Sequence, residues 1–148
     1  MCYLKTLHVY FLTCLLLLLT ACDKSDESII TTVQDPEIVA IAFFNALYNE
    51  KNVKKAASVC SPKMARLLLH YRSSAAVGRH LFNMSYDNVR IKPDTSGVKL
   101  RKQFSDSAQI TVYFDGYHNE SRIKDVKRLA IIQKGGKWFI DEVLKDPF

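Results

Sequence analysis

The chain has 148 residues, of which 48% are hydrophobic, and its 21 lysines and arginines against 15 aspartates and glutamates give a formal charge of +6. This length matches one domain with a sizeable core. A domain of this size can have a sizeable core without disulfides or metals. The basic excess favours anionic partners.

The first 22 residues carry an export signal. Lys5 and His8 precede an apolar run over residues 9–19 that ends in five consecutive leucines. A basic start, an apolar centre and small residues at the end are typical of a secretory signal peptide. The run is shorter than the roughly 20 apolar residues of a membrane-spanning helix, and no later stretch is apolar enough to span. The run ends in Leu19-Thr20-Ala21-Cys22, which resembles the bacterial lipobox.

The lipobox resemblance implies that residues 1–21 are removed and that the sulfur of Cys22 receives a diacylglycerol, often with a further acyl chain on the new amino group. Two or three acyl chains hold a protein at a membrane essentially permanently. The prediction is a lipoprotein of the bacterial cell membrane that faces the periplasm. Asp23 slightly favours the inner membrane, and the outer membrane stays open. The alternatives are an N-terminal anchor helix or a signal cut elsewhere.

Export also limits the partners. An exported, tethered protein rarely meets nucleic acid, so the predicted partners are the lipid bilayer, through acylated Cys22, and an anionic lipid or an envelope protein. A homodimer stays open. Cys2 and Cys14 leave with the signal, and Cys60 is the remaining thiol. Because Cys60 falls on the apolar stripe of a predicted helix, we expect a buried structural thiol.

Helices are predicted at the start of the domain over residues 35–148, after a flexible tether over residues 22–34. Asp35-Pro36 predicts a helix start with Asp35 as the cap. Asn52 can cap a second helix and Ser61-Pro62 begins a third, while residues 74–82 predict a weaker fourth. The first and third helices carry apolar stripes, which are Ala40, Phe43, Phe44, Leu47 and Tyr48, and Met64, Leu67, Leu68 and Tyr71.

Strands are predicted after about residue 83, where the apolar spacing changes from helical to alternating. Five fit, over residues 85–92, 98–104, 108–115, within 122–134, and 137–144. A loop is expected over residues 116–121, and Gly135-Gly136 predicts a two-residue hairpin turn. The fold class is therefore α+β, with three to four helices packed on a curved antiparallel sheet of about five strands.

Two stretches resemble the NTF2-like family. Residues 43–52, FFNALYNEKN, followed by Ala56-Ala57, are similar to its first helix, short turn and second helix. Residues 135–143, GGKWFIDEV, are similar to its closing hairpin. The resemblance implies a cone in which a bent sheet wraps the first helix around a cavity. Such cones serve as isomerases and dehydratases, as ligand pockets, and as assembly modules, and fold alone does not choose among these uses.

Catalysis of the ketosteroid-isomerase type needs a carboxylate base and a phenol in one apolar cavity. The residues of the right type are Asp115, Asp141, Tyr113, Tyr86 and His80. Asp141 with Tyr113 is the preferred pair, because Asp115 next to Gly116 is expected in a turn. No cofactor and no metal are predicted, since His70, His80 and His118 lack metal-ligand spacing.

Basic residues cluster on two predicted strands, as Lys99, Arg101 and Lys102 and as Arg122, Lys124, Lys127 and Arg128. Alternation sends some of them to one sheet face, which is either a solvated surface or a docking surface for anionic lipid or an acidic partner. The predicted function is a membrane-anchored, non-catalytic binding or assembly module of the cell envelope. The alternatives are a cavity-based isomerase or lyase and a carrier of a small apolar ligand.

Overall fold

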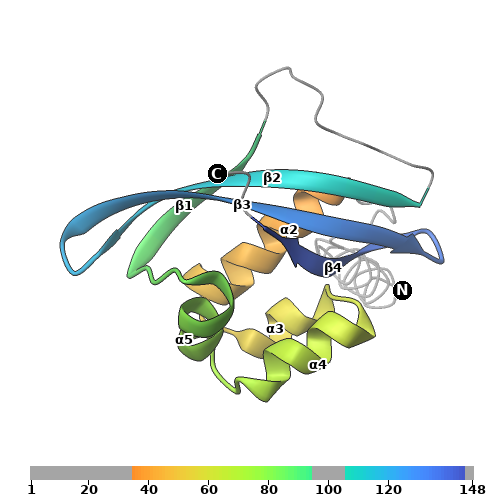
Figure 1. The fold of residues 1–148 in the computed structure, drawn as a ribbon, viewed down its shortest axis with the longest axis horizontal. Coiled ribbons are helices and arrows are strands. Elements are labelled where there is room, and N and C mark those ends of the chain that lie inside the picture. The colour runs from red at the N-terminus through yellow and green to blue at the C-terminus, as the bar shows by residue number, and fades with distance from the viewer. Residues whose placement is uncertain (1–34, 95–105, 146–148) are drawn as a thin grey trace, which may run out of the picture. The chain divides into compact units, whose positions relative to one another are not determined.

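The computed structural model describes residues 35–94 and 106–145, and helices precede strands along the chain (Figure 1). This order confirms the α+β class. The helices, of which η2 and η3 are π-helical, are α2 Pro36–Phe44, η2 Asn45–Asn49, α3 Val53–Ser58, α4 Pro62–His70, α5 Ser74–Val77 and η3 Gly78–Phe82. The strands are β1 Asn88–Pro93, β2 Ser107–His118, β3 Ser121–Lys134 and β4 Lys137–Leu144.

Side-chain caps begin two of the helices as predicted. The side chain of Asn52 accepts a hydrogen bond from the backbone N–H of Lys55, and that of Ser61 accepts one from Met64. The prediction for Asp35 is wrong, because its side chain makes no capping bond and its backbone carbonyl accepts from the N–H groups of Ile38 and Val39 instead. Pro36, which has no N–H, still occupies the first helical position.

The apolar stripe of the first helix forms the centre of the core. Phe43, Phe44, Leu47 and Tyr48 are all at most 4% exposed. The ring of Phe44 meets that of Phe114 edge-on at 4.7 Å, which joins the helix to β2. The stripe predicted for the third helix is partly wrong. Leu67 is 40% exposed, because the one face of α4 that reaches the core is already filled by Met64 and Leu68.

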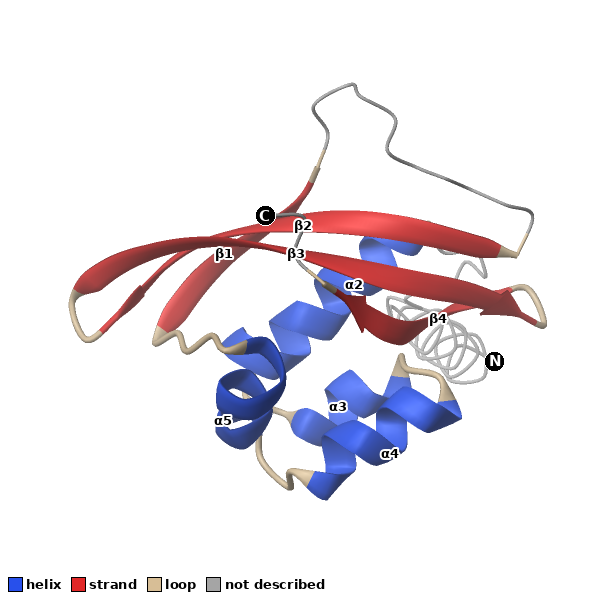
Figure 2. Ribbon diagram, viewed as in Figure 1, coloured by secondary structure: helices blue, strands red, loops and turns tan. Residues whose placement is uncertain are grey.

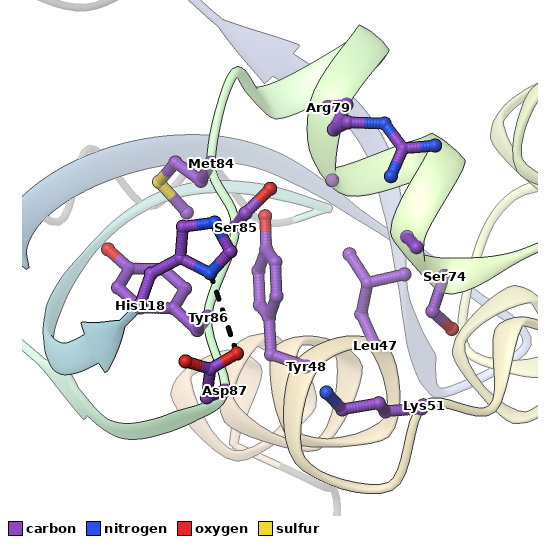
Figure 3. Close-up of a pocket in the computed structure, with 12 residues that line it drawn as sticks. Leu47, Tyr48, Lys51, Ser74, Arg79, Met84, Ser85, Tyr86, Asp87 and His118 are labelled. Atoms are coloured by element: carbon purple, nitrogen blue, oxygen red, sulfur yellow. Dashed lines mark ion pairs between the residues drawn. The ribbon is translucent and has the colours of Figure 1, made fainter. Parts of the chain in front are cut away.

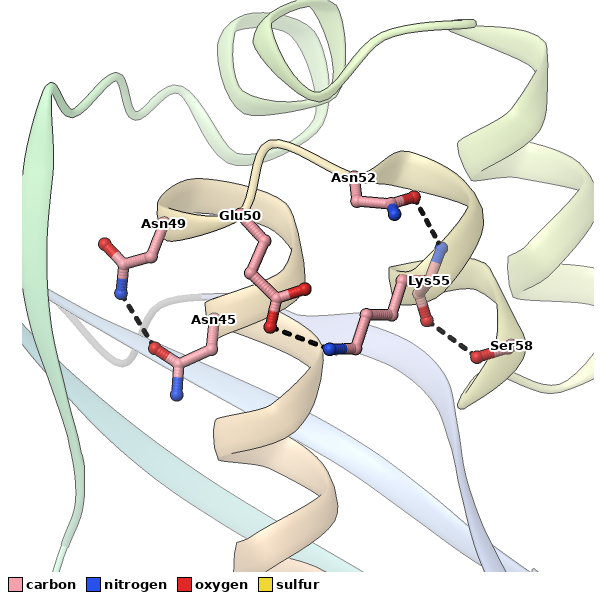
Figure 4. Close-up of polar contacts among 6 residues, drawn as sticks. All are labelled: Asn45, Asn49, Glu50, Asn52, Lys55 and Ser58. Carbon is pink, nitrogen blue, oxygen red and sulfur yellow. Dashed lines mark hydrogen bonds and ion pairs between the residues drawn. The ribbon is translucent and has the colours of Figure 1, made fainter.

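Polar contacts fix the connection between η2 and α3 (Figure 4). Glu50 forms a 2.8 Å ion pair with Lys55, and Asn49 donates to Asn45. The side chain of Asn49 also donates to the carbonyl of Val89 at 3.0 Å and accepts from its N–H at 3.3 Å. One amide side chain therefore satisfies both backbone groups of a residue in β1, and holds that strand against the helical layer.

The four described strands form one antiparallel sheet in the order β1-β2-β3-β4. The strand predicted over residues 98–104 lies outside the described residues. The prediction of a loop over residues 116–121 is wrong, because β2 continues to His118 and pairs it with Ser121. Asn119 and Glu120 both take positive φ, 48° and 64°, which makes the two-residue turn that suits the twist of a hairpin.

The closing hairpin turns at Gly135 and Gly136, as predicted, with φ of 57° and 76°. Its strands shift register between Ala130 and Ile131. Ile131 pairs with Ile140 and Ala130 with Glu142, so Asp141 is the extra residue of a β-bulge.

The sheet has an inner face toward the helices and an outer face away from them (Figure 2). Along β2 the inner residues Ala108, Ile110, Val112 and Phe114 are buried, and they alternate with more exposed residues of the outer face, namely Gln109, Thr111, Tyr113, Asp115 and Tyr117. Within the described ranges, no helix is both long and apolar enough to cross a membrane.

Candidate functional site

Basic residues on neighbouring strands make the outer face of the sheet positive. Arg90, Asp115 and Lys124 lie side by side on β1, β2 and β3, because the register pairs Arg90 with Asp115 and Asp115 with Lys124. Two residues further along β1, Lys92 lies beside Tyr113 of β2. Residues directly opposite in neighbouring strands point to the same face. We call this group, with Tyr117, Arg122 and Arg128, the outer basic face.

Asp115 is the carboxylate at the centre of the outer basic face. Both nitrogens of the Arg122 fork donate to it, from Nε to Oδ1 at 2.7 Å and from Nη2 to Oδ2 at 2.6 Å. These hydrogen bonds hold the pKa of Asp115 below its usual range, and the charges of Arg122, Lys124 and Arg90 lower it further. The bidentate pair with Asp115 therefore neutralises the charge of Arg122, and the other cations give the outer basic face a positive excess.

The outer basic face is also hollowed. A depression of about 280 Å³ is lined by Arg90, Lys92, Tyr113, Asp115 and Lys124, together with Phe114 and Asp125. Tyr113 is 47% exposed and Tyr117 46% exposed, so two aromatic rings accompany the cations. Cations around exposed aromatic rings can bind an anionic group and cover the apolar part next to it.

The sequence predicted only part of this face. Arg122, Lys124 and Arg128 lie on it, but Lys127 is 8% exposed, so its inclusion in a surface patch is wrong. Alternation along β3 sends Lys127 inward with Leu129 and Ile131. Lys99, Arg101 and Lys102 lie outside the described residues. Arg90 and Lys92 were missed, although the alternation around Val89 and Ile91 was a signal for them.

The inner face carries a partly buried ion pair next to a second cavity. Nζ of Lys127 lies 3.4 Å from Oδ1 of Asp125. Both line a cavity of about 550 Å³, within the range of roughly 300–1,000 Å³ typical of ligand pockets. The remaining lining residues are His80, Leu81, Phe82, Asn83, Val143, Leu144 and Lys145.

A third, smaller cavity of about 170 Å³ lies where η2, η3 and the chain before β1 meet (Figure 3). Tyr48 and Tyr86 line it, and each phenol is at most 5% exposed. Burial raises the pKa of Tyr86 to about 12 and that of Tyr48 further, with the charge of Asp125 adding to both. At its edge, Nδ1 of His118 lies 3.5 Å from Oδ1 of Asp87, whose pKa is lowered first by the backbone N–H of Asn119.

The preferred catalytic pair is not brought together. Tyr113 is on β2, on the outer face, whereas Asp141 is on β4, and β3 lies between their strands. Asp115 is in mid-strand on the outer face and not in a turn. Among the candidate phenols, Tyr86 lines the 170 Å³ cavity together with Tyr48, at a ring distance of 5.4 Å, whereas Tyr113 lines the depression of the outer face.

The histidines and the cysteine are likewise placed apart. His80 stacks on Tyr71 at 5.8 Å, and His70 meets the same ring at 5.7 Å. Over residues 35–94 and 106–145, no three His, Cys, Asp or Glu residues are grouped closely enough to hold a metal ion. Cys60 is a buried thiol, as expected; its Sγ donates to the carbonyl of Ala56, and burial raises its pKa to about 12.

Comparisons of this chain with family models, with curated proteins and with solved structures find no match.

Proposed function

We propose that the chain is a lipid-anchored lipoprotein of the bacterial cell envelope, and that its domain is a non-catalytic binding module facing the periplasm. The binding role is supported by the positive excess of the outer basic face. Arg122 neutralises Asp115, and Arg90, Lys92 and Lys124 remain as additional cations on the same face. A surface with excess cations and exposed tyrosines suits an anionic partner. The support for the anchor is the lipobox-like segment ending in Cys22.

We also propose that the domain is NTF2-like. The support is the order of helices before an antiparallel sheet, the contact of α2 with β1, β2 and β4, and the β-bulge that bends the closing hairpin. This likeness leaves the use of the domain open. The proposed binding role therefore depends on the outer basic face and not on the fold.

The anchor is tested by replacing the acylated sulfur. In cells fed a labelled fatty acid, a Cys22→Ala variant should lose the label entirely, because no other residue takes its place in the lipobox-like segment. A Cys60→Ala variant is the matched control and should be labelled like the parent chain, since Cys60 is buried. A Cys22→Ala chain that still carries the label would disprove the anchor.

The binding role is tested by photo-cross-linking in intact cells. A photoreactive phenylalanine analogue at Tyr113 should form a defined adduct with an envelope component, because this ring is in the centre of the outer basic face. The same analogue at Leu67 is the control, since Leu67 is also exposed, at 40%, but on α4. Equal adducts at both positions, or none at Tyr113, would contradict a binding role for this face.

A second function, the carrier of a small ligand, is favoured by the cavity beside Lys127. Its volume suits a small molecule, and the Lys127 and Asp125 pair supplies charged groups beside the apolar residues Leu81, Phe82, Val143 and Leu144. Native mass spectrometry of the full chain released in mild detergent should then show a retained small mass that a Lys127→Met variant loses. A bare chain mass in the parent protein would count against the carrier.

A further inference from the structure

Three cations of the outer basic face are left without a carboxylate. Arg122 neutralises Asp115, and among the described residues Arg90, Lys92 and Lys124 make no ion pair within 4 Å. All three are exposed. Arg90 and Lys92 lie on β1 and Lys124 lies on β3, with β2 and its Asp115 between them, so the three cations form one group about 10 Å wide across the strands.

The composition of this face suits a lipid surface better than a protein interface. The buried centre of a protein–protein interface is depleted in lysine. Anionic bilayer surfaces instead attract clustered lysine and arginine, and tyrosine rings lie at the level of the headgroups. Lys92 and Lys124 surround the exposed ring of Tyr113, and Tyr117 is similarly exposed on the same strand.

The proposed anchor keeps the domain near such a surface. Residues 22–34 span at most about 45 Å even when fully extended, and the described domain begins at residue 35. A surface held this close to its target binds at a high effective concentration, so contacts that are individually weak are sufficient. Each cation near an anionic bilayer strengthens binding by about fivefold.

We infer that the outer basic face docks on the anionic lipid headgroups of the same membrane that holds the acylated Cys22. This inference rests on the proposed anchor and names the partner of the same face. The domain then lies with its sheet against the bilayer, and the helices and the cavity beside Lys127 face away from it.

The test measures thiol protection in the full acylated chain, reconstituted in vesicles. A Thr111→Cys variant places a thiol on the outer face beside Tyr113, and a Ser58→Cys variant places a matched thiol on α3. The native thiols do not interfere, because Cys22 is acylated and Cys60 is buried. Vesicles of neutral phosphatidylcholine are compared with vesicles that also contain anionic phosphatidylglycerol, using a membrane-impermeant maleimide.

We expect labelling of the Thr111→Cys thiol to slow at least about fivefold in the anionic vesicles. Labelling of the Ser58→Cys thiol should not change. High salt should remove the protection, because it screens exposed charges. Combining Thr111→Cys with Arg90→Gln, Lys92→Gln and Lys124→Gln should remove it too.

Two results would overturn lipid docking, and they show whether the anchor is wrong as well. If the chain floats with both kinds of vesicle but the Thr111→Cys thiol is labelled equally fast in both, docking on lipid is wrong while the anchor stands. If the chain floats with neither kind of vesicle, the anchor itself is wrong, and the lipid docking that depends on it is overturned with it.

Discussion

The buried thiol of Cys60 and the buried phenol of Tyr86 both have a raised pKa, each to about 12, against ordinary values of 9.0 and 10.0. Burial is the main cause in both cases, because it disfavours the charged form. A group whose pKa is raised by folding stabilises the folded state fully below its ordinary pKa. That stabilisation is lost as the pH rises toward the pKa of the folded state.

The free energy of unfolding should therefore fall steadily between about pH 9 and pH 12. Urea titrations followed by circular dichroism measure this fall. A Tyr86→Phe variant should lose less stability between pH 10 and 12 than the parent chain, since its ring cannot ionise. A Tyr113→Phe variant is the control, and a fall of the same size in both variants would contradict this explanation.

Gly116 is in mid-strand, where only a residue without a side chain fits. A Cβ atom at this position would meet the carbonyl oxygen of Asn88 and the ring of Tyr86. A Gly116→Ala variant should lower the free energy of unfolding by about 1–3 kcal/mol, the usual cost of overpacking. A Gln109→Ala variant on the same strand should change it by less than about 0.5 kcal/mol. Equal effects in urea unfolding would show that the close approach is not real.

Among the secondary-structure elements, the hairpin between β2 and β3 was predicted wrongly, because the position of its turn was inferred from Gly116. Glycine in a strand often marks a turn, so Gly116 suggested a loop. The structure instead uses Gly116 to let β1 approach, and it turns at Asn119 and Glu120. A positive φ at Glu120 is unfavourable for a residue with a side chain, which is why the pattern gave no sign of a turn there.

Replacing the strained residue of this turn should stabilise the chain. Glu120 has φ of 64°, a conformation that glycine adopts without a steric cost. A Glu120→Gly variant should raise the free energy of unfolding by about 1 kcal/mol. The midpoint of thermal unfolding should rise by a few degrees. A Glu120→Ala variant keeps the strain and should not gain, and a destabilised Glu120→Gly variant would contradict the turn geometry.

The hydrogen bonds of Asn49 connect η2 to β1 and should contribute measurably to stability. An Asn49→Ala variant removes both hydrogen bonds to Val89, which should cost about 1–3 kcal/mol because two backbone groups lose their partner. A Glu50→Ala variant removes only an exposed ion pair and should cost less than about 1 kcal/mol. Urea unfolding distinguishes them, and equal costs would show that Asn49 does not hold the strand.

Across the whole molecule, the sequence predicted the elements better than the site. Periodicity predicted the α2 stripe and the alternation in β2, because both report which side of an element is buried. Neither could place Lys127, since a basic residue is expected at the surface unless its strand register is known. The register also decides that Arg90, Asp115 and Lys124 form one row. Long-range pairing of this kind leaves no signature in a local pattern.

The two faces of the sheet offer different functions. The inner face holds the cavity with Lys127 and Asp125, which favours a small ligand. The outer face has the cation excess around Tyr113, which favours an extended anionic partner. We propose that the charge of the outer basic face, and not its shape alone, drives binding.

The role of charge is tested by the yield of the Tyr113 photo-adduct in spheroplasts, measured as a function of ionic strength and of the charge of the outer basic face. Raising the salt from low concentration to about 0.5 M shortens the screening length to about 4 Å. We predict a several-fold loss of adduct, and the same loss at low salt in an Arg90→Glu, Lys124→Glu variant. A Lys54→Glu, Lys63→Glu variant, altered on the helices, should keep the parent yield. An adduct yield that falls neither with salt nor with the charge reversals at Arg90 and Lys124 would show that charge does not drive binding to this face.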